Sequence, residues 1–233
     1  MNVAVIPALN EELSVGEVVR GIRRHVDLAV VVDNDSRDRT AERAKDAGAE
    51  VITQQARGYG AACLAGIERA RELGAKVILF LDSDGSEDPD EAPLLVAPTQ
   101  SGEADLALGV RTRETIAQGA MTGPQRLGNW LAPTLMRLLL GARYSDLPPF
   151  KAIRVDALDR LALRDPAHGF TIELLLEAHR HRLRVVERVV HCRPRLAGES
   201  KVSGTLSGSI RAGAKIIYSI GRYALRGRFI SGG

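Results

Sequence analysis

Two carboxylates separated by one residue follow an apolar run that is typical of a buried strand. Asp82 and Asp84 flank Ser83 directly after residues 77–81. Alternate residues of an extended chain project to the same side, so both carboxylates can face one cation. Hard oxygen ligands suit Mg²⁺ or Mn²⁺, and these ions commonly share their coordination shell with substrate phosphates. The pair therefore predicts a metal site that neutralises a departing phosphate group, although such pairs also occur in turns and helix caps.

The elements expected to position this pair alternate between strand and helix. The expected strands cover residues 3–6, 28–32, 51–52 and 77–81. The expected helices cover residues 12–25, 40–47 and 61–73. Apolar strands separated by helices indicate a parallel sheet covered on both faces, and ligands of such sheets bind beyond the carboxyl ends of the strands. Glu11, Asp33 and Asp35 are therefore expected along the same edge as Asp82 and Asp84.

The second half of the chain is less regular in its hydrophobic pattern. Strands are expected over residues 104–108, 151–155 and 183–190. Helices are expected over residues 127–140, 172–181 and 206–225, and loops over residues 111–125 and 197–204.

Composition places the chain among folded soluble proteins, because 45% of its residues are hydrophobic and 26% are charged. Cys63 and Cys192 lie far apart without metal-ligand spacing, which argues against a zinc site or a disulfide framework. No apolar run approaches the roughly 20 residues that span a bilayer, and no signal peptide is recognised. We expect a cytoplasmic protein. Peripheral attachment to the inner face of the membrane stays open as an alternative.

Seven motifs occur in a fixed order along the chain. They are residues 7–12 (PALNEE), 31–40 (VVDNDSRDRT), 57–62 (RGYGAA), 81–84 (LDSD), 109–111 (GVR), 145–154 (SDLPPFKAIR) and 198–201 (GESK). Their ordered combination resembles the family 2 glycosyltransferases of the GT-A fold, and within them the dolichol-phosphate mannose synthase-like group. The resemblance covers roughly residues 2–204.

The resemblance implies a Rossmann-like α/β/α sandwich with a mostly parallel sheet. It implies one GT-A domain over residues 1–204, with a nucleotide-sugar-binding half over 1–110 and an acceptor-binding half over 111–204. A basic amphipathic helix and tail are expected over 205–233. The implied reaction is inverting transfer of a sugar from a nucleotide-diphosphate sugar, with Mg²⁺ or Mn²⁺ bound by Asp82 and Asp84.

The donor site implied by the resemblance draws on several of these motifs. Its residues are Pro7, Leu9, Glu11, Asp33, Asn34, Asp35, Gly58, Asp82, Ser83, Asp84 and Arg111. Asn34 departs from the second aspartate that is frequent in the dolichol-phosphate group, and Leu9 replaces a common tyrosine, so the identity of the base stays open. Ser86 is either a further metal ligand or the cap of the next helix.

Four residues are candidates for catalysis. Arg126 and Lys201, like Arg111, are candidates for phosphate contacts, because guanidinium and ammonium groups complement phosphate oxygens. Asp146 and Glu173 are candidate general bases, with a turn residue and a helix-dipole partner as the structural alternatives. Neither His168 nor His181 is placed by a motif, and both are better explained as surface histidines.

The resemblance suggests a polyprenyl-phosphate acceptor, which, as an ionised phosphate, needs no general base. Residues 193–228 carry eight basic side chains against Glu199, so the C-terminal helix could contact anionic lipid. Alternatively its apolar stripe packs on the domain or on a second subunit in a homodimer. A saccharide or small-molecule hydroxyl acceptor is the alternative substrate.

Other classes of function fit the sequence less well. The turn after the first strand lacks glycine, which argues against dinucleotide-binding oxidoreductases and nucleotidyltransferases. Intact Asp82 and Asp84 argue against a catalytically silent nucleotide-binding module. Aromatic residues make up 4% of the chain, and no basic patch is interleaved with them for base stacking, so no nucleic-acid partner is expected.

Overall fold

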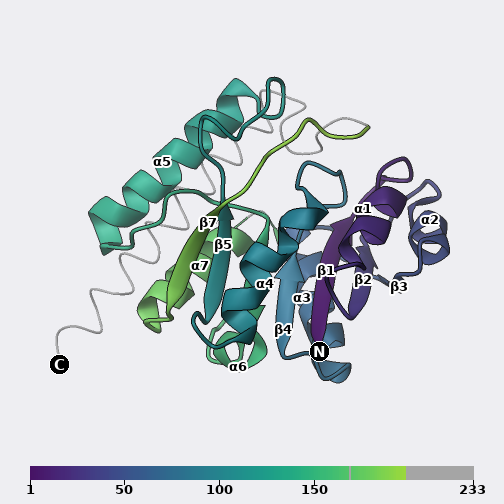
Figure 1. Cartoon of the computed structure of the whole chain (residues 1–233), viewed down its shortest axis with the longest axis horizontal. Coiled ribbons are helices and arrows are strands. Elements are labelled where there is room, and N and C mark those ends of the chain that lie inside the picture. The colour runs from purple at the N-terminus through teal and green to yellow at the C-terminus, as the bar shows by residue number, and fades with distance from the viewer. Residues whose placement is uncertain (168, 198–233) are drawn as a thin grey trace.

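A seven-stranded sheet forms the centre of the computed structural model, which describes residues 1–167 and 169–197 (Figure 1). The strands are β1 (Asn2–Ala8), β2 (Leu28–Asp33), β3 (Glu50–Thr53), β4 (Val77–Phe80), β5 (Leu106–Val110), β6 (Lys151–Arg154) and β7 (Val185–Val189). Their order is β3-β2-β1-β4-β6-β5-β7. All neighbours pair in parallel except β6, which runs antiparallel to both β4 and β5. The expected mostly parallel sheet is confirmed.

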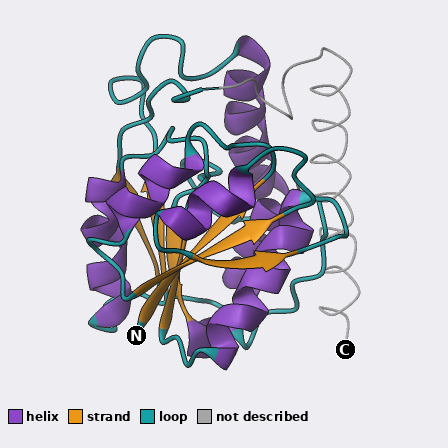
Figure 2. Cartoon of the chain, turned by 90° about the vertical axis from the view of Figure 1, so that its right-hand side faces the viewer, coloured by secondary structure: helices purple, strands orange, loops and turns teal. Residues whose placement is uncertain are grey.

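Helices cover both faces of this sheet, as Figure 2 shows from the side. The helices are α1 (Val15–Ile22), α2 (Thr40–Asp46), α3 (Tyr59–Glu72), the 3₁₀ helix η1 (Pro89–Glu91), α4 (Ala92–Gln100), α5 (Gly123–Leu140), α6 (Val155–Leu158) and α7 (Phe170–Arg180). One hydrophobic core includes buried residues of α1, α2 and α4, and the other includes buried residues of α3, α5, α6 and α7. The expected three-layer α/β/α sandwich is therefore confirmed.

Strand β1 illustrates why the sequence forms this sandwich. Val3 and Val5 belong to the core beneath α3, whereas Ala4 and Ile6 belong to the core beneath α1. All four are fully buried, because alternate side chains of a strand point to opposite faces and both faces are covered. Burying a large aliphatic side chain contributes about 1.5–3 kcal/mol, so the apolar run specifies a central strand.

The structure differs from the sequence expectations around several prolines. Strand β1 continues through Pro7, although proline has no N–H to donate to a neighbouring strand. The pairing of β1 with β4 ends at Val5, so no hydrogen bond from residue 7 to β4 is lost. Helix α4 was not expected, since Pro93 and Pro98 lie within it. Pro93 occupies the first turn, where its missing N–H has no intrahelical role.

Some expectations concern parts of the chain outside the described residues. These are the loop and helix beyond residue 197, including Lys201, and His168. Within the described part of the chain, no helix is both long and apolar enough to cross a membrane.

Candidate functional site

A cavity of about 730 Å³ opens beyond the carboxyl ends of β1 and β4. Nine of the eleven predicted donor-site residues line it, namely Pro7, Leu9, Glu11, Asn34, Gly58, Asp82, Ser83, Asp84 and Arg111. The opposite wall includes Gly119, Ala120, Met121, Thr122 and Gln125, which precede or begin α5. Residues distant in the sequence thus enclose one space of the size typical of ligand sites.

The Asp82-Ser83-Asp84 segment forms part of the cavity lining. Ser83 ties the segment to β1, because its hydroxyl donates a hydrogen bond to the Pro7 carbonyl over 2.9 Å. The Asp84 Oδ1 atom accepts from the Ser86 backbone N–H at 2.9 Å, which closes a tight turn around Gly85. Ser86 does not cap the next helix; Asp88 caps η1 by accepting from the Asp90 N–H at 3.1 Å.

A third acidic residue, Glu87, lies beside this pair. Its Oε2 atom accepts from the Asp82 backbone N–H at 3.1 Å, and its Oε1 atom accepts from the Ser86 hydroxyl at 3.1 Å. Burial, followed by the charges of Asp82 and Asp84, raises the pKa of Glu87 to about 8. Burial and the charge of Asp84 likewise raise the pKa of Asp82 to about 7. Burial and mutual repulsion therefore disfavour the ionised forms of both carboxyls in the absence of a cation.

The residues fit a divalent cation that shares its shell with phosphates. No described group donates a hydrogen bond to the Asp82 carboxylate, and burial together with the charge of Asp84 disfavours its ionised form, which a bound cation would stabilise. Among the described residues, however, no group of three or more His, Cys, Asp or Glu side chains is arranged to hold a metal. Asp82 and Asp84 therefore suit an ion that takes its remaining ligands from substrate or water.

Arg195 supplies a cation to the same cavity from the chain that follows β7. Its Nη1 atom lies 2.6 Å from Asp84 Oδ2, and its Nη2 atom is paired with Glu11 Oε1. Both partners are almost completely buried, whereas Arg195 is partly exposed. This arginine joins the ends of β1 and β4 across the cavity floor, and it was not among the residues predicted from the sequence.

Asn34 shapes the wall of the cavity opposite Arg111. Its side-chain NH₂ donates to the carbonyls of Gln54 and Ala56, both at 2.9 Å, and its Oδ1 atom accepts from the Gly58 N–H at 2.8 Å. Gly58 has φ 143°, and a Cβ there would lie 2.1 Å from the Pro166 carbonyl oxygen, so this turn requires glycine. The two bonds to carbonyls require the side-chain NH₂ of Asn34, which an ionised aspartate could not supply.

Asp33 and Asp35 are the two predicted donor residues that do not line the cavity. Asp33 ends β2 and is buried, and its Oδ1 atom has no hydrogen-bond partner among the described residues. Asp35 has φ 65° and forms an exposed ion pair with Arg57 at 2.9 Å. A buried acceptor without a partner is costly, so Asp33 is the better placed of the two for accepting bonds from a ligand.

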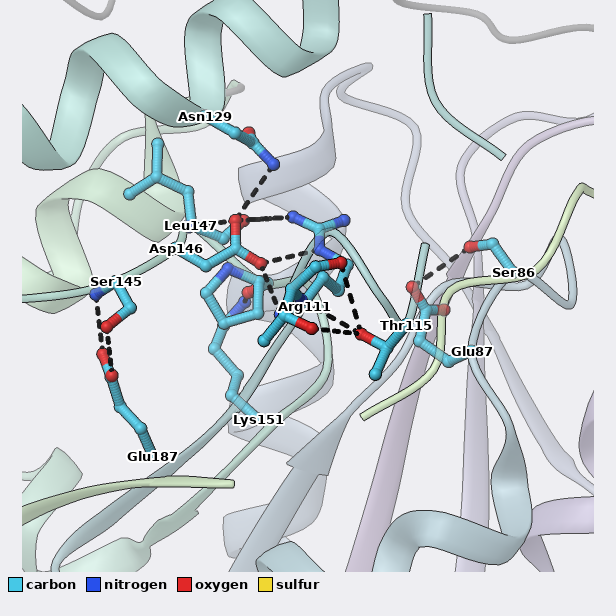
Figure 3. A network of polar contacts seen from close by, with 12 residues as sticks. Ser86, Glu87, Arg111, Thr115, Asn129, Ser145, Asp146, Leu147, Lys151 and Glu187 are labelled. Atoms are coloured by element: carbon cyan, nitrogen blue, oxygen red, sulfur yellow. Dashed lines mark hydrogen bonds and ion pairs between the residues drawn. The ribbon is translucent and has the colours of Figure 1, made fainter. Parts of the chain in front are cut away.

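Arg111 and Asp146 form a two-point ion pair at the side of the cavity, drawn in Figure 3. Asp146 also accepts hydrogen bonds from the Arg111 and Leu147 backbone N–H groups and from the Asn129 amide. Burial lowers the pKa of Arg111, but the charge of Asp146 and its hydrogen bonds raise it by more. Arg111 therefore stays charged. In this arrangement the Asp146 carboxylate is fully occupied.

The other predicted catalytic residues lie away from the cavity lining. Glu173, on α7, accepts from the Arg164 and Asp165 backbone N–H groups, both at 2.7 Å. Arg126 is exposed on α5 next to Gln125, which does line the cavity. His181, which was interpreted as a surface histidine, caps the C-terminus of α7 and lies 3.5 Å from Glu177. The structure therefore brings none of these three side chains to the Asp82-Asp84 segment.

Lys151 is a fully buried cation beneath the site. Its ammonium group donates to the carbonyls of Pro148 and Pro149 and to the Thr171 hydroxyl, at 3.1–3.2 Å. It also lies 5.6 Å from the centre of the Phe80 ring. Burial lowers the pKa of Lys151 to about 8. Because Pro149 lines the cavity, Lys151 supports its wall from below.

Sequence reasoning missed Glu87, Arg195 and the role of Lys151. Lys151 stands in one of the quoted motifs and Arg195 lies three residues before another, but neither motif shows what its side chain contacts. Glu87 follows Asp84 in an acidic run that resembles a solvated turn. Their contacts arise only when the strands are assembled.

Comparisons with known proteins agree with this architecture. The model of the family described as Glycosyl transferase family 2 matches residues 3–162. An uncharacterized glycosyltransferase of Mycobacterium tuberculosis is 38% identical over 208 residues, which are 89% of this chain and 92% of that protein. Undecaprenyl-phosphate mannosyltransferase of Micrococcus luteus is 28% identical over 240 residues, covering 97% of this chain and 94% of that protein.

A solved structure supports the fold. Glucosyl-3-phosphoglycerate synthase from Mycobacterium tuberculosis, in complex with Mn²⁺, UDP-glucose and phosphoglyceric acid, has a TM-score of 0.78 at 23% identity, covering 96% of this chain and 79% of that one. At this identity the likeness shows the fold alone, and it confirms the expected GT-A fold. The family model matches well over half of the chain, and the 38% identical relative covers nearly all of it. The chain therefore belongs to glycosyl transferase family 2 and is a glycosyltransferase.

Proposed function

We propose that the protein transfers a sugar, with inversion, from a nucleotide-diphosphate sugar that binds in the described cavity together with Mg²⁺ or Mn²⁺. The observation that carries the proposal is the pair of carboxylates, Asp82 and Asp84, side by side on the lining of this cavity. The acceptor would attack the anomeric carbon as the bond from that carbon to the diphosphate oxygen breaks. Neutralising the diphosphate makes it a better leaving group.

The cavity wall divides into parts that suit this donor. Pro7, Leu9, Asn34 and Gly58 would face the nucleoside, because they line the cavity at the ends of β1 and β2 and at the start of α3, and the buried Asp33 would be a further acceptor. Asp82 and Asp84 would hold the metal and, through it, the diphosphate. Residues 119–125 would lie on the acceptor side, in line with a division between donor and acceptor halves near residue 110.

Arg111 is proposed to contact the departing phosphate, and Asp146 to position Arg111. Asp146 fixes the Nε and Nη2 atoms of the guanidinium, and Nη2 also donates to the Leu147 carbonyl. A guanidinium held in this way can offer its remaining donors to a phosphate without first losing side-chain freedom. We therefore favour positioning over proton abstraction as the role of Asp146.

An ionised phosphate is the acceptor that this site supports best. A hydroxyl acceptor usually needs a general base, but both carboxylates expected in that role are engaged, Asp146 by Arg111 and Glu173 by backbone N–H groups. The similarity to an undecaprenyl-phosphate mannosyltransferase supports a polyprenyl phosphate. The alternative is a small soluble acceptor, favoured by the structural likeness to a synthase solved with phosphoglyceric acid.

The test is to supply radiolabelled UDP-, GDP- and dTDP-sugars with Mn²⁺ and to offer undecaprenyl phosphate or phosphoglycerate as the acceptor. Label that enters the organic phase only with the lipid phosphate supports the proposal. Label that enters a water-soluble product only with the small acceptor favours the alternative. Free sugar in both cases, at a rate that Asp82→Asn does not reduce, contradicts transfer at this site.

A further inference from the structure

The segment after β7 lies along the acidic segment that begins with Asp84. Residues 191–196, called here the strap, run antiparallel to residues 84–87, with a bridge between Glu87 and Cys192. The Arg193 N–H donates to the Ser86 carbonyl at 2.9 Å, and the Leu196 N–H donates to the Asp84 carbonyl at 2.9 Å. The strap is thus attached by its backbone to the turn that carries the proposed metal ligand.

Alternate side chains of the strap pair with acidic side chains opposite. His191 pairs with Glu91, Arg193 pairs with Asp88, and Arg195 pairs with Asp84 and Glu11. The side chains of His191 and Arg193 are 66% and 52% exposed, whereas that of Arg195 is 25% exposed and lines the cavity. Only the last of these pairs therefore lies inside the donor site.

Arg195 competes directly with a cation at Asp84. Asp84 Oδ1 already accepts the Ser86 N–H, and Oδ2 holds Arg195 Nη1 at 2.6 Å. A metal bound to Asp84 Oδ2 would lie close to the guanidinium and would repel it. A cation at Asp84 would therefore weaken the contact between Asp84 and Arg195.

Gly85 shows how closely the strap is seated. It has φ 77°, and a Cβ at this position would lie 2.4 Å from Leu196 Cδ1. The Leu196 side chain therefore packs directly over the turn that carries Asp84.

We propose that Arg195 is the resident counter-ion of the donor site and that a divalent cation displaces it from Asp84. This inference rests on the proposed metal-dependent function. Before loading, one guanidinium balances part of the charge of Glu11 and Asp84; after loading, the cation does so. The pairs of His191 and Arg193, outside the cavity, keep the rest of the strap in place.

The experiment is a titration of the full-length protein with Mn²⁺ alone, in which free Mn²⁺ is followed by electron paramagnetic resonance. Arg195→Gln removes the competing charge and should bind Mn²⁺ about fivefold more tightly than wild type, the scale of a partly exposed ion pair. Arg195→Lys should stay close to wild type. Arg193→Gln is the matched control, because it removes a strap charge outside the cavity, and its affinity should not change.

Thermal stability gives a readout that is independent of activity. In EDTA, Arg195→Gln should melt below Arg193→Gln, because it leaves two buried carboxylates without their cation, and saturating Mn²⁺ should recover most of that difference. Equal or weaker Mn²⁺ binding by Arg195→Gln than by wild type overturns the displacement. If neither wild type nor any variant binds Mn²⁺, the metal site and the inference are both overturned. This result is distinguishable from the previous one, in which wild type binds Mn²⁺.

Discussion

Asp146 holds the guanidinium of Arg111 at two points, with 2.7 Å from Nε to one carboxylate oxygen and 3.0 Å from Nη2 to the other. The side chains are 4% and 12% exposed, so this pair is shielded from water. It joins the end of β5 to the chain between α5 and β6, on the side of the cavity where the leaving group would depart.

Asp146→Asn tests which role this contact serves. Loss of the carboxylate charge should lower the free energy of unfolding by about 3 kcal/mol, because the Arg111 charge is left buried without its partner. The Tm should then fall by roughly 6–12 °C. If Asp146 positions Arg111, the donor KM rises about tenfold and the pH–rate profile keeps its shape. If turnover instead falls by about a hundredfold or more and the acidic limb of the profile disappears, Asp146 is the general base.

Asn34→Asp should disrupt the nucleoside side of the cavity. The new carboxylate would face the carbonyls of Gln54 and Ala56, to which the amide now donates at 2.9 Å. We expect a loss of about 1–3 kcal/mol in the free energy of unfolding and weaker donor binding. Chemical denaturation of this variant beside Asn34→Ala measures the effect. An Asn34→Asp protein as stable as wild type would contradict the assigned hydrogen bonds.

Glu173→Ala separates a structural role from a catalytic one. Removing the carboxylate leaves the Arg164 and Asp165 N–H groups without their acceptor, at a cost of about 1–3 kcal/mol for each group that water does not reach. The Tm should fall, while the turnover rate measured well below the melting range stays within about twofold of wild type. If the folded variant instead turns over about a hundredfold more slowly than wild type, Glu173 is restored as a candidate base.

The acidic segment should make the metal-free protein less stable as the pH rises. The folded-state pKa of Asp82, about 7, lies above its ordinary value of 3.8, so the folded state binds the proton more tightly. Stability from this group is present below about pH 4 and is lost progressively up to about pH 7. In EDTA, Asp82→Asn should therefore gain Tm relative to wild type over this range.

Comparing the two proteins in parallel cancels the titration of histidines and other common groups. Saturating Mn²⁺ should reverse the order, because only the wild type retains both metal ligands. A Tm difference that does not change between about pH 4.5 and about pH 7.5 would contradict the raised pKa of Asp82.

The donor half of the fold could be predicted from the sequence because its signals are local. The apolar runs at β1, β2 and β4 place Glu11 and the Asp82-Asp84 pair at one edge by strand direction alone. Asn34 was expected in the pocket, but its role depends on carbonyls 20 and 22 residues away, which no local pattern specifies.

Contacts between distant segments explain what could not be predicted. Arg195 meets Asp84 across 111 residues and Glu11 across 184, and the antiparallel β6 places Lys151 opposite Phe80. Helix α4 was missed because Pro93 and Pro98 are breakers by propensity, whereas its buried Leu95 and Val96 pack in the core.

The most direct test of the central claim is a thermal-shift comparison of wild type and Asp82→Asn with UDP-, GDP- and dTDP-sugars, each with Mn²⁺ or with EDTA. A ligand present at about 100 times its Kd stabilises the native state by about 2.7 kcal/mol, or roughly 5–11 °C here. We predict such a shift for one nucleotide sugar, only with Mn²⁺ and only in wild type. Shifts that are equal in both proteins, or no shift with any donor, would contradict a metal-dependent sugar-donor site at Asp82 and Asp84.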